Sequence, residues 1–167
     1  MTVPSAFSDL GNFIVSFQAV EAHVVEVIAE LTGGDKENVH ALVTELEYNS
    51  RLRAADVMYS RFASERKAID NIATPKAFHT LMVELQKLGE RRNTLVHSNY
   101  SFLISGGGLM GLGRKNRKLR PSRGVQELES EYLVDKSLDK DIQRLTVALH
   151  ELETIRQQIS TVVNVAK

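Results

Sequence analysis

The sequence predicts an all-α fold, an up-down bundle of four to five helices with a β-hairpin or loop inserted before the last helix. Apolar residues recur at helical spacing along most of the chain, which gives each expected helix one apolar face to bury against its neighbours. Capping residues, glycines and prolines mark where these segments begin and end. Five of the ten glycines instead gather between residues 106 and 113, in a region without helical periodicity.

The first helix is expected over about Ser8–Leu31, where apolar residues return every three or four positions. Gly33-Gly34 follows directly and is a natural helix stop. Asp35 is an N-cap candidate for a second helical region that reaches about Phe62. A break or bend is expected in that region near residues 48–50.

Thr74-Pro75 predicts the start of a third helical region, because threonine caps well and proline suits the first helical position. Its apolar stripe continues to about Tyr100. Residues 101–134 have a different texture and are expected to form a mobile hairpin or extended loop, with short strands near 100–105 and 127–134. Ser137 is expected to cap the last helix. The whole chain, 1–167, is interpreted as one domain.

The composition excludes several classes of protein. The 167 residues contain no cysteine, so neither disulfides nor thiolate metal sites are available. No segment is apolar enough to span a bilayer, and the first residues lack the basic and apolar pattern of a signal peptide. A cytoplasmic location is therefore expected.

The charge is balanced overall but unevenly distributed. The chain has 21 basic and 21 acidic residues, yet six cations and no acid lie between residues 114 and 123. This basic run is expected either to bind an RNA backbone or to be a solvated loop that pairs with Glu127, Glu129 and Glu131. It contains no aromatic residue, so base stacking by the run itself is not expected. Its cations are Arg114, Lys115, Arg117, Lys118, Arg120 and Arg123.

The glycines at 106, 108 and 111 match the letters of a dinucleotide-binding G-x-G-x-x-G motif. No helix is expected directly after them, and no strand–helix–strand unit surrounds them. A flexible hairpin tip is therefore favoured over a nucleotide site.

The end of the third helical region carries the side chains best suited to binding or catalysis. On a helical wheel Arg92 falls in the middle of the apolar stripe, where its charge needs an acid, a carbonyl or a bound anion. Glu21, at the edge of the first helix's apolar face, is a candidate partner. Asn93, His97 and Tyr100 form a contiguous polar flank.

Arg92 and His97 lie about 140° apart around the helix and about 7.5 Å apart along it. They do not meet on one isolated helix. They would converge on a ligand in a groove, or across a two-fold axis where two copies of this helix face each other. The symmetric dimer is the simpler geometry.

This set of residues suits metal-independent cleavage of RNA. Histidine changes its protonation near neutral pH, so His97 suits removal of the proton from a 2′-hydroxyl. Arg92 suits stabilisation of the charge that develops on the phosphoryl oxygens. Asn93 and Tyr100 are expected to orient the histidine or donate hydrogen bonds. The other histidines show no metal-ligand spacing, so no metal or cofactor is expected.

The segment Arg92-Asn93-Thr94-Leu95-Val96-His97 resembles the Arg-(four to six residues)-His motif of HEPN domains, including the polar residue after the arginine. The resemblance implies a helical bundle that forms a homodimer with both motifs in one cleft. Many members of that superfamily are metal-independent ribonucleases of toxin–antitoxin, phage-defence or CRISPR systems, and others are inactive binding modules. Expected partners are RNA, a second copy and an antitoxin or regulatory protein.

Two alternatives stay open at this point. Arg91 also fits the motif's spacing, although its place on the wheel favours Arg92. A non-catalytic HEPN-like module that binds protein, nucleic acid or nucleotide is the alternative function. In one class of HEPN toxins a tyrosine stands two residues after the histidine, but here that position is Asn99 and the tyrosine is Tyr100.

Overall fold

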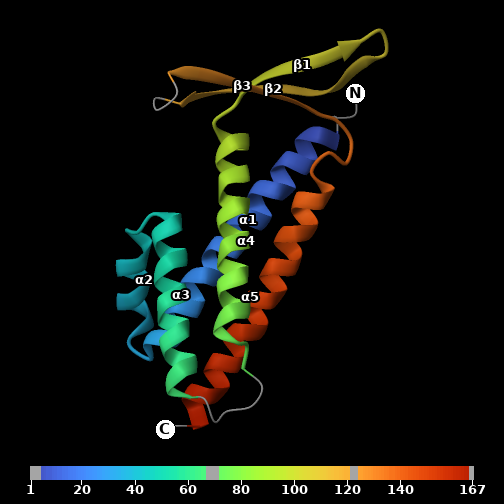
Figure 1. Cartoon of the computed structure of the whole chain (residues 1–167). Coiled ribbons are helices and arrows are strands. Elements are labelled where there is room, and N and C mark those ends of the chain that lie inside the picture. Colours follow the sequence, from blue (N-terminus) through green and yellow to red (C-terminus); the bar gives the residue numbers. More distant parts are fainter. Residues whose placement is uncertain (1–4, 67–71, 121–123, 166–167) are drawn as a thin grey trace.

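The computed structural model describes residues 5–66, 72–120 and 124–165. A bundle of helices forms most of the molecule, and a small antiparallel sheet lies across one end of it (Figure 1). The helices are α1 (Ser5–Thr32), α2 (Lys36–Thr44), α3 (Tyr48–Glu65), α4 (Pro75–Val96) and α5 (Asp139–Val165). The strands are β1 (Asn99–Ser105), β2 (Gly108–Arg120) and β3 (Val125–Leu133).

Local capping explains where two of the helices begin. The Asp35 side chain accepts a hydrogen bond of 2.9 Å from the backbone N–H of Glu37, which starts α2. The Thr74 hydroxyl accepts one of 3.2 Å from the N–H of Ala77, and Pro75 occupies the first turn of α4. Both caps confirm the sequence prediction. The predicted break in the second helical region is the short connection at residues 45–47.

Helix α1 is the centre of the bundle. It packs along α5 and against α3, while α4 packs mainly against α3, so α4 and α5 stand apart on one side (Figure 1). The apolar stripes predicted from the sequence face this core. Its fully buried large side chains include Phe13, Val20, Tyr59, Phe78, Leu85, Leu88, Leu145, Leu152 and Ile159.

The fold is mainly helical but not all-α, because the chain between α4 and α5 forms a three-stranded sheet in the order β1-β2-β3. The basic run, expected in a mobile loop, makes up part of β2. β2 is the central strand and is hydrogen-bonded on both edges, which a single hairpin would not provide. Leu112 of β2 and Leu133 of β3 are cross-strand partners, and both are buried in the bundle core.

Two boundaries also differ from the prediction. Helix α4 ends at Val96, so Tyr100 belongs to β1 instead of the helix. Ser137 does not cap α5, which begins two residues later at Asp139. Its hydroxyl instead accepts a hydrogen bond of 2.9 Å from the N–H of Val134 and holds the turn after β3.

Gly89 permits the close approach of α4 to α3. A Cβ at this position would lie 2.6 Å from Cε1 of Tyr48. That ring is held in place, because its hydroxyl donates to the Leu85 carbonyl at 3.1 Å and the ring packs on Phe17 with centroids 5.1 Å apart.

We expect Gly89→Ala to lower the free energy of unfolding by about 1–3 kcal/mol, the usual effect of overpacking. Gly11→Ala is the matched control: Gly11 is also helical, but nothing lies within 4 Å of its would-be Cβ. That change should raise stability by about 0.5–1 kcal/mol. Urea unfolding measures both, and equal gains from the two substitutions would contradict the close packing.

Candidate functional site

Arg92 lies at the upper end of the apolar stripe of α4, as the helical wheel predicts. Its guanidinium carbon is 5.9 Å from the centroid of the Phe17 ring, and its Nη1 donates to Oδ1 of Asn93 at 3.0 Å. Within the part of the chain that the structure describes, no carboxylate pairs with it. The predicted partner Glu21 instead accepts from Nη1 of Arg51, also at 3.0 Å. The pairing of Arg92 with Glu21 was therefore wrong.

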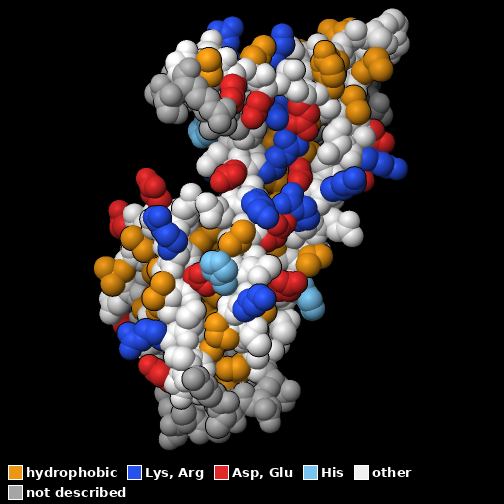
Figure 2. All heavy atoms as spheres, viewed as in Figure 1, with side chains coloured by type: hydrophobic (Ala, Val, Ile, Leu, Met, Phe, Trp, Pro, Cys, Tyr) orange, Lys and Arg blue, Asp and Glu red, His pale blue; other side chains and the backbone are white. Residues whose placement is uncertain are grey.

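A pocket of about 410 Å³ lies in front of Arg92, between the C-terminal part of α4, the start of α3 and the side of α1. Figure 2 shows the surface hollowed above the upper end of α3. The pocket mixes cationic, acidic and aromatic groups, and sequence reasoning missed most of them. It is lined by Phe17, Glu21, Glu47, Tyr48, Asn49, Gly89, Arg92 and Asn93.

His97 is the C-cap of α4. Its backbone N–H donates to the Asn93 carbonyl at 3.0 Å, and its side chain is exposed. Among residues 5–66, 72–120 and 124–165 no hydrogen bond or ion pair engages the imidazole. Arg92, Asn93 and His97 therefore share one helix end, where His97 is exposed and the half-buried Arg92 lines the pocket.

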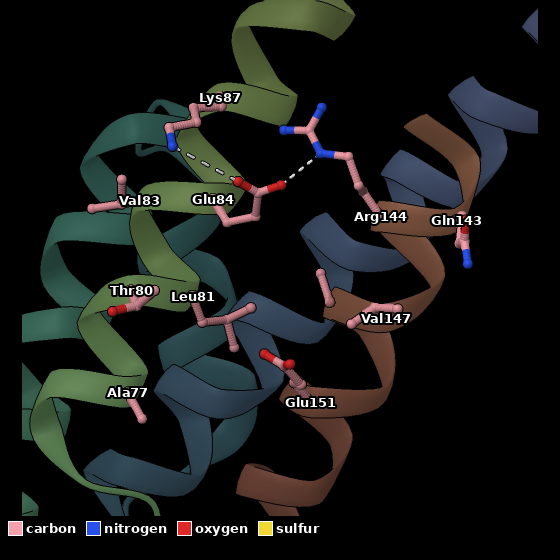
Figure 3. A pocket seen from close by; sticks show the side chains of 11 residues that line it. Ala77, Thr80, Leu81, Val83, Glu84, Lys87, Gln143, Arg144, Val147 and Glu151 are labelled. Carbon is pink, nitrogen blue, oxygen red and sulfur yellow. Dashed lines mark hydrogen bonds and ion pairs between the residues drawn. The ribbon is translucent and has the colours of Figure 1, made fainter. Parts of the chain in front are cut away.

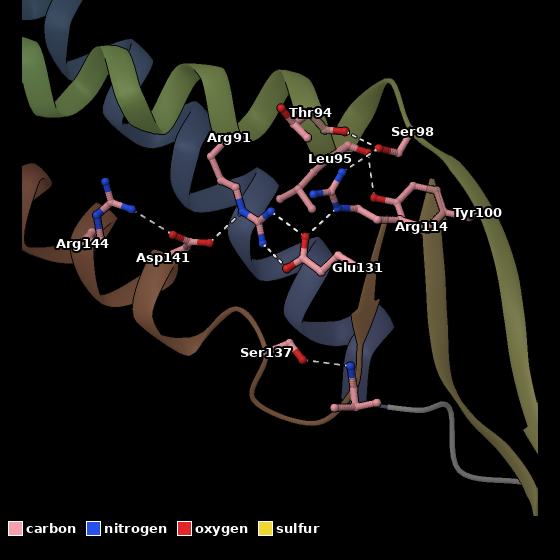
Figure 4. A network of polar contacts seen from close by, with 11 residues as sticks. Arg91, Thr94, Leu95, Ser98, Tyr100, Arg114, Glu131, Ser137, Asp141 and Arg144 are labelled. Carbon is pink, nitrogen blue, oxygen red and sulfur yellow. Dashed lines mark hydrogen bonds and ion pairs between the residues drawn. The ribbon is translucent and has the colours of Figure 1, made fainter. Parts of the chain in front are cut away.

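Arg91, the competing arginine, has all three guanidinium nitrogens engaged by carboxylates (Figure 4). Its two terminal nitrogens both donate to the Glu131 carboxylate at 2.7 Å, and its Nε donates to Asp141 at 2.9 Å. This bidentate pair connects α4 to β3 and α5. The Arg91 hydrogen bonds hold the pKa of Glu131 below its usual range. The sequence left the choice between Arg91 and Arg92 open. Because Arg91 is held by two carboxylates, the structure favours Arg92 as the arginine that could bind a ligand.

Arg114, which was expected among the RNA-binding cations, is buried in the structure. It is only 6% exposed, and its Nε donates to Glu131 at 2.6 Å while Nη1 donates to the Ser98 hydroxyl at 3.2 Å. The register explains the burial: Arg114 is the cross-strand partner of Glu131, on the side of the sheet that faces the helices. We refer to Arg91, Arg114, Glu131 and Asp141 as the clamp.

Tyr100 also has a structural task. Its hydroxyl donates at 2.7 Å to the Leu95 carbonyl, one of the carbonyls left unpaired at the end of α4. Burial raises its pKa. Because its one proton is committed to this backbone bond, Tyr100 secures the turn that carries His97 and is not placed to donate to a substrate.

The remaining cations of the basic run have different positions. Lys115 and Arg117 are exposed on β2. Lys118 and Arg120 belong to the same strand, but their side chains, like all of Arg123, lie outside the residues that the structure describes. In the described ranges no group of three or more potential metal ligands occurs.

A second concave surface lies between α4 and α5, where the two helices stand apart (Figure 3). This groove has a volume of about 670 Å³ and a largely apolar floor that includes Leu81, Val83, Val147 and Ala148. An ion pair of 2.6 Å from Arg144 to Glu84 bridges it. Both walls belong to predicted helices, but no sequence pattern showed that they would be separated.

No known protein family, curated protein or solved structure matches this chain. None of the helices in the described ranges has the length and apolar character needed to cross a bilayer.

Glu131 is expected to stabilise the fold only while it is ionised. Its folded-state pKa is lowered, so its contribution is present above the ordinary value near 4.5 and is lost as the pH falls below it. Glu131→Gln should therefore cost about 2 kcal/mol near neutral pH, because it weakens the bonds to two arginines.

Urea unfolding as a function of pH measures this effect, and the gap between wild type and Glu131→Gln should narrow below about pH 4.5. Glu90→Gln is the matched control, since Glu90 is exposed on α4. If the difference in unfolding free energy between wild type and Glu131→Gln stays constant well below pH 4.5, the substitution does not act through the ionised clamp carboxylate.

Proposed function

We propose that this protein is a metal-independent endoribonuclease of HEPN type. His97 acts as the acid/base that moves the proton of the attacking 2′-hydroxyl and of the leaving oxygen. Arg92 stabilises the charge that builds up on the phosphoryl oxygens. Asn93, bonded to the guanidinium at 3.0 Å, orients it. The residues of the motif Arg92-Asn93-x-x-x-His97 thus each have a role.

The contrast between the two neighbouring arginines carries this proposal. Arg91 forms ion pairs with Glu131 and Asp141, whereas Arg92 lines the pocket and has no ion-pair partner in the described residues. An arginine held on an apolar stripe without a carboxylate is arranged to receive an anion from outside. His97 is exposed at the same helix end, which supports the proposal that this end of α4 acts on a bound phosphate.

The site we propose is completed by a second copy of the chain. Arg92 and His97 diverge by about 140° on α4, so one chain does not direct both at the same phosphate. A two-fold axis beside the end of α4 would bring Arg92 of one protomer to His97 of the other. An antitoxin or regulatory protein remains a further proposed partner.

A non-catalytic interaction module is the second candidate. Glu21 and Glu47 line the same pocket as Arg92, and carboxylates there oppose the approach of a phosphate. The apolar groove between α4 and α5 is a surface of the kind that partner proteins cover. In this case the wild type would have no enzymatic activity, and His97→Ala would change only the association or the stability of the protein.

The proposal is tested by incubating mixed RNA with the pure protein in EDTA. Wild type should cleave, and His97→Ala should lower the rate by about 10²–10⁴-fold. Arg92→Ala should lower it by about 10²–10³-fold. The controls are His150→Ala and Arg61→Ala, exposed residues distant in sequence from the motif, which should cleave like wild type. Intact RNA with wild type, at every concentration tried, would favour the interaction module.

Mixing two inactive variants tests the shared site. If each site takes Arg92 from one chain and His97 from the other, a mixed dimer of Arg92→Ala and His97→Ala chains contains one intact site. Cleavage should then reappear when the two are refolded together, at up to about half the wild-type rate per mixed dimer. Continued inactivity of a dimer verified to be mixed would place both residues in one chain's site.

A further inference from the structure

The sheet separates the charges of its strands between its two faces. Side chains alternate along a strand, so residues two apart share a face. The acids of the strands, Glu127, Glu129 and Glu131, all lie at odd positions of β3, on the face of Arg114 and the helices. The opposite face therefore carries no acid in the strand residues that the structure describes. We define this outer sheet face by Ser101, Lys115, Arg117, Leu128, Ser130 and Tyr132.

Cations and an aromatic ring stand together on the outer sheet face. Lys115 and Arg117 are both exposed and lie about 7 Å apart along β2. Tyr132 is 72% exposed and pairs with Gly113, which makes it a diagonal neighbour of Lys115. In Figure 2 blue and orange side chains stand along the top of the sheet, with red ones below the strands.

Gly113 leaves space for the ring of Tyr132, its cross-strand partner. A Cβ at Gly113 would lie 3.6 Å from Cε1 of Tyr132 and 3.4 Å from Cδ2 of Leu103. The absent side chain gives the ring space to lean over the strand, with Leu103 beside it. An aromatic ring supported from below by a glycine and largely exposed is suited to stack with a planar group.

We propose that the outer sheet face binds single-stranded RNA, with one base stacked on Tyr132 and the flanking phosphates bound by Lys115 and Arg117. Bases in a single strand are free to stack on protein side chains, whereas a duplex hides their faces. The acid-free cationic surface matches the backbone charge. The face also begins near the proposed site, because Asn99, two residues after His97, is the cross-strand partner of Lys115.

The choice of RNA rests on the proposed ribonuclease function, but binding is measurable without cleavage. The experiment uses the full chain with His97→Ala, in EDTA, and follows the fluorescence anisotropy of a short labelled polyuridylate. Tyr132→Ala should weaken binding roughly ten-fold, and Tyr132→Phe should retain it because the ring remains. Replacing both Lys115 and Arg117 with alanine should flatten the dependence of log K on log salt by about 0.7 for each lost contact.

Matched controls come from the other side of the sheet and from the bundle. Phe102 is 65% exposed on the helix-facing side, so Phe102→Ala removes an aromatic without touching the outer sheet face. Lys140→Ala removes an exposed cation of α5. Both should bind polyuridylate like the parent protein.

Three outcomes would overturn this inference: unchanged affinity in Tyr132→Ala, duplex RNA bound as tightly as the single strand, or an effect of Tyr132→Ala on self-association alone. The last would assign the face to a second copy of the chain. Binding that depends on Tyr132, in a wild type that leaves RNA intact, would support the inference while the proposed ribonuclease function fails. If wild type cleaves RNA and Tyr132→Ala binds and cleaves like the parent protein, the ribonuclease function would be supported and this inference would fail.

Discussion

The structure depends on one carboxylate shared by two arginines. Glu131 of β3 accepts from Arg91 of α4 and Arg114 of β2, and Asp141 of α5 completes the clamp. These charges are partly or almost wholly withdrawn from water, so each needs the others. The clamp sits where the sheet meets the bundle, beside the buried pair Leu112 and Leu133. Apolar burial attaches the sheet to the helices, and the clamp specifies its orientation.

The same arrangement prepares the end of α4. Arg114 donates to Ser98 and Tyr100 donates to the Leu95 carbonyl, so bonds from the sheet hold the turn on both sides of His97. Arg91 bonds to Glu131 and Asp141 of the clamp, so its neighbour Arg92 is the arginine that lines the pocket. Two adjacent residues of identical chemistry thus acquire different tasks, because successive residues on a helix point about 100° apart. One points to the sheet and α5, the other to the pocket beside Phe17.

The proposed activities place different demands on the two faces of the sheet. The helix-facing side is used for attachment and is rich in paired charges, while the outer sheet face carries exposed cations and an aromatic ring. Strand periodicity alone produces this division. A nuclease that cleaves at the end of α4 would need a surface nearby to hold the rest of the strand, and the outer sheet face begins at that point.

The sequence by itself determined the helices, because their signals are local: apolar spacing, the Asp35 and Thr74 caps, and Gly33-Gly34 after the first helix. It also predicted that Arg92 lies on the apolar stripe. Only the tertiary structure decided that the basic run is a central strand, that Arg114 is buried, and that Arg91 instead of Arg92 carries the ion pairs. Those outcomes depend on β3 pairing with β2 and on the approach of α5. Such contacts join residues 17 to 50 positions apart, and no local pattern encodes them.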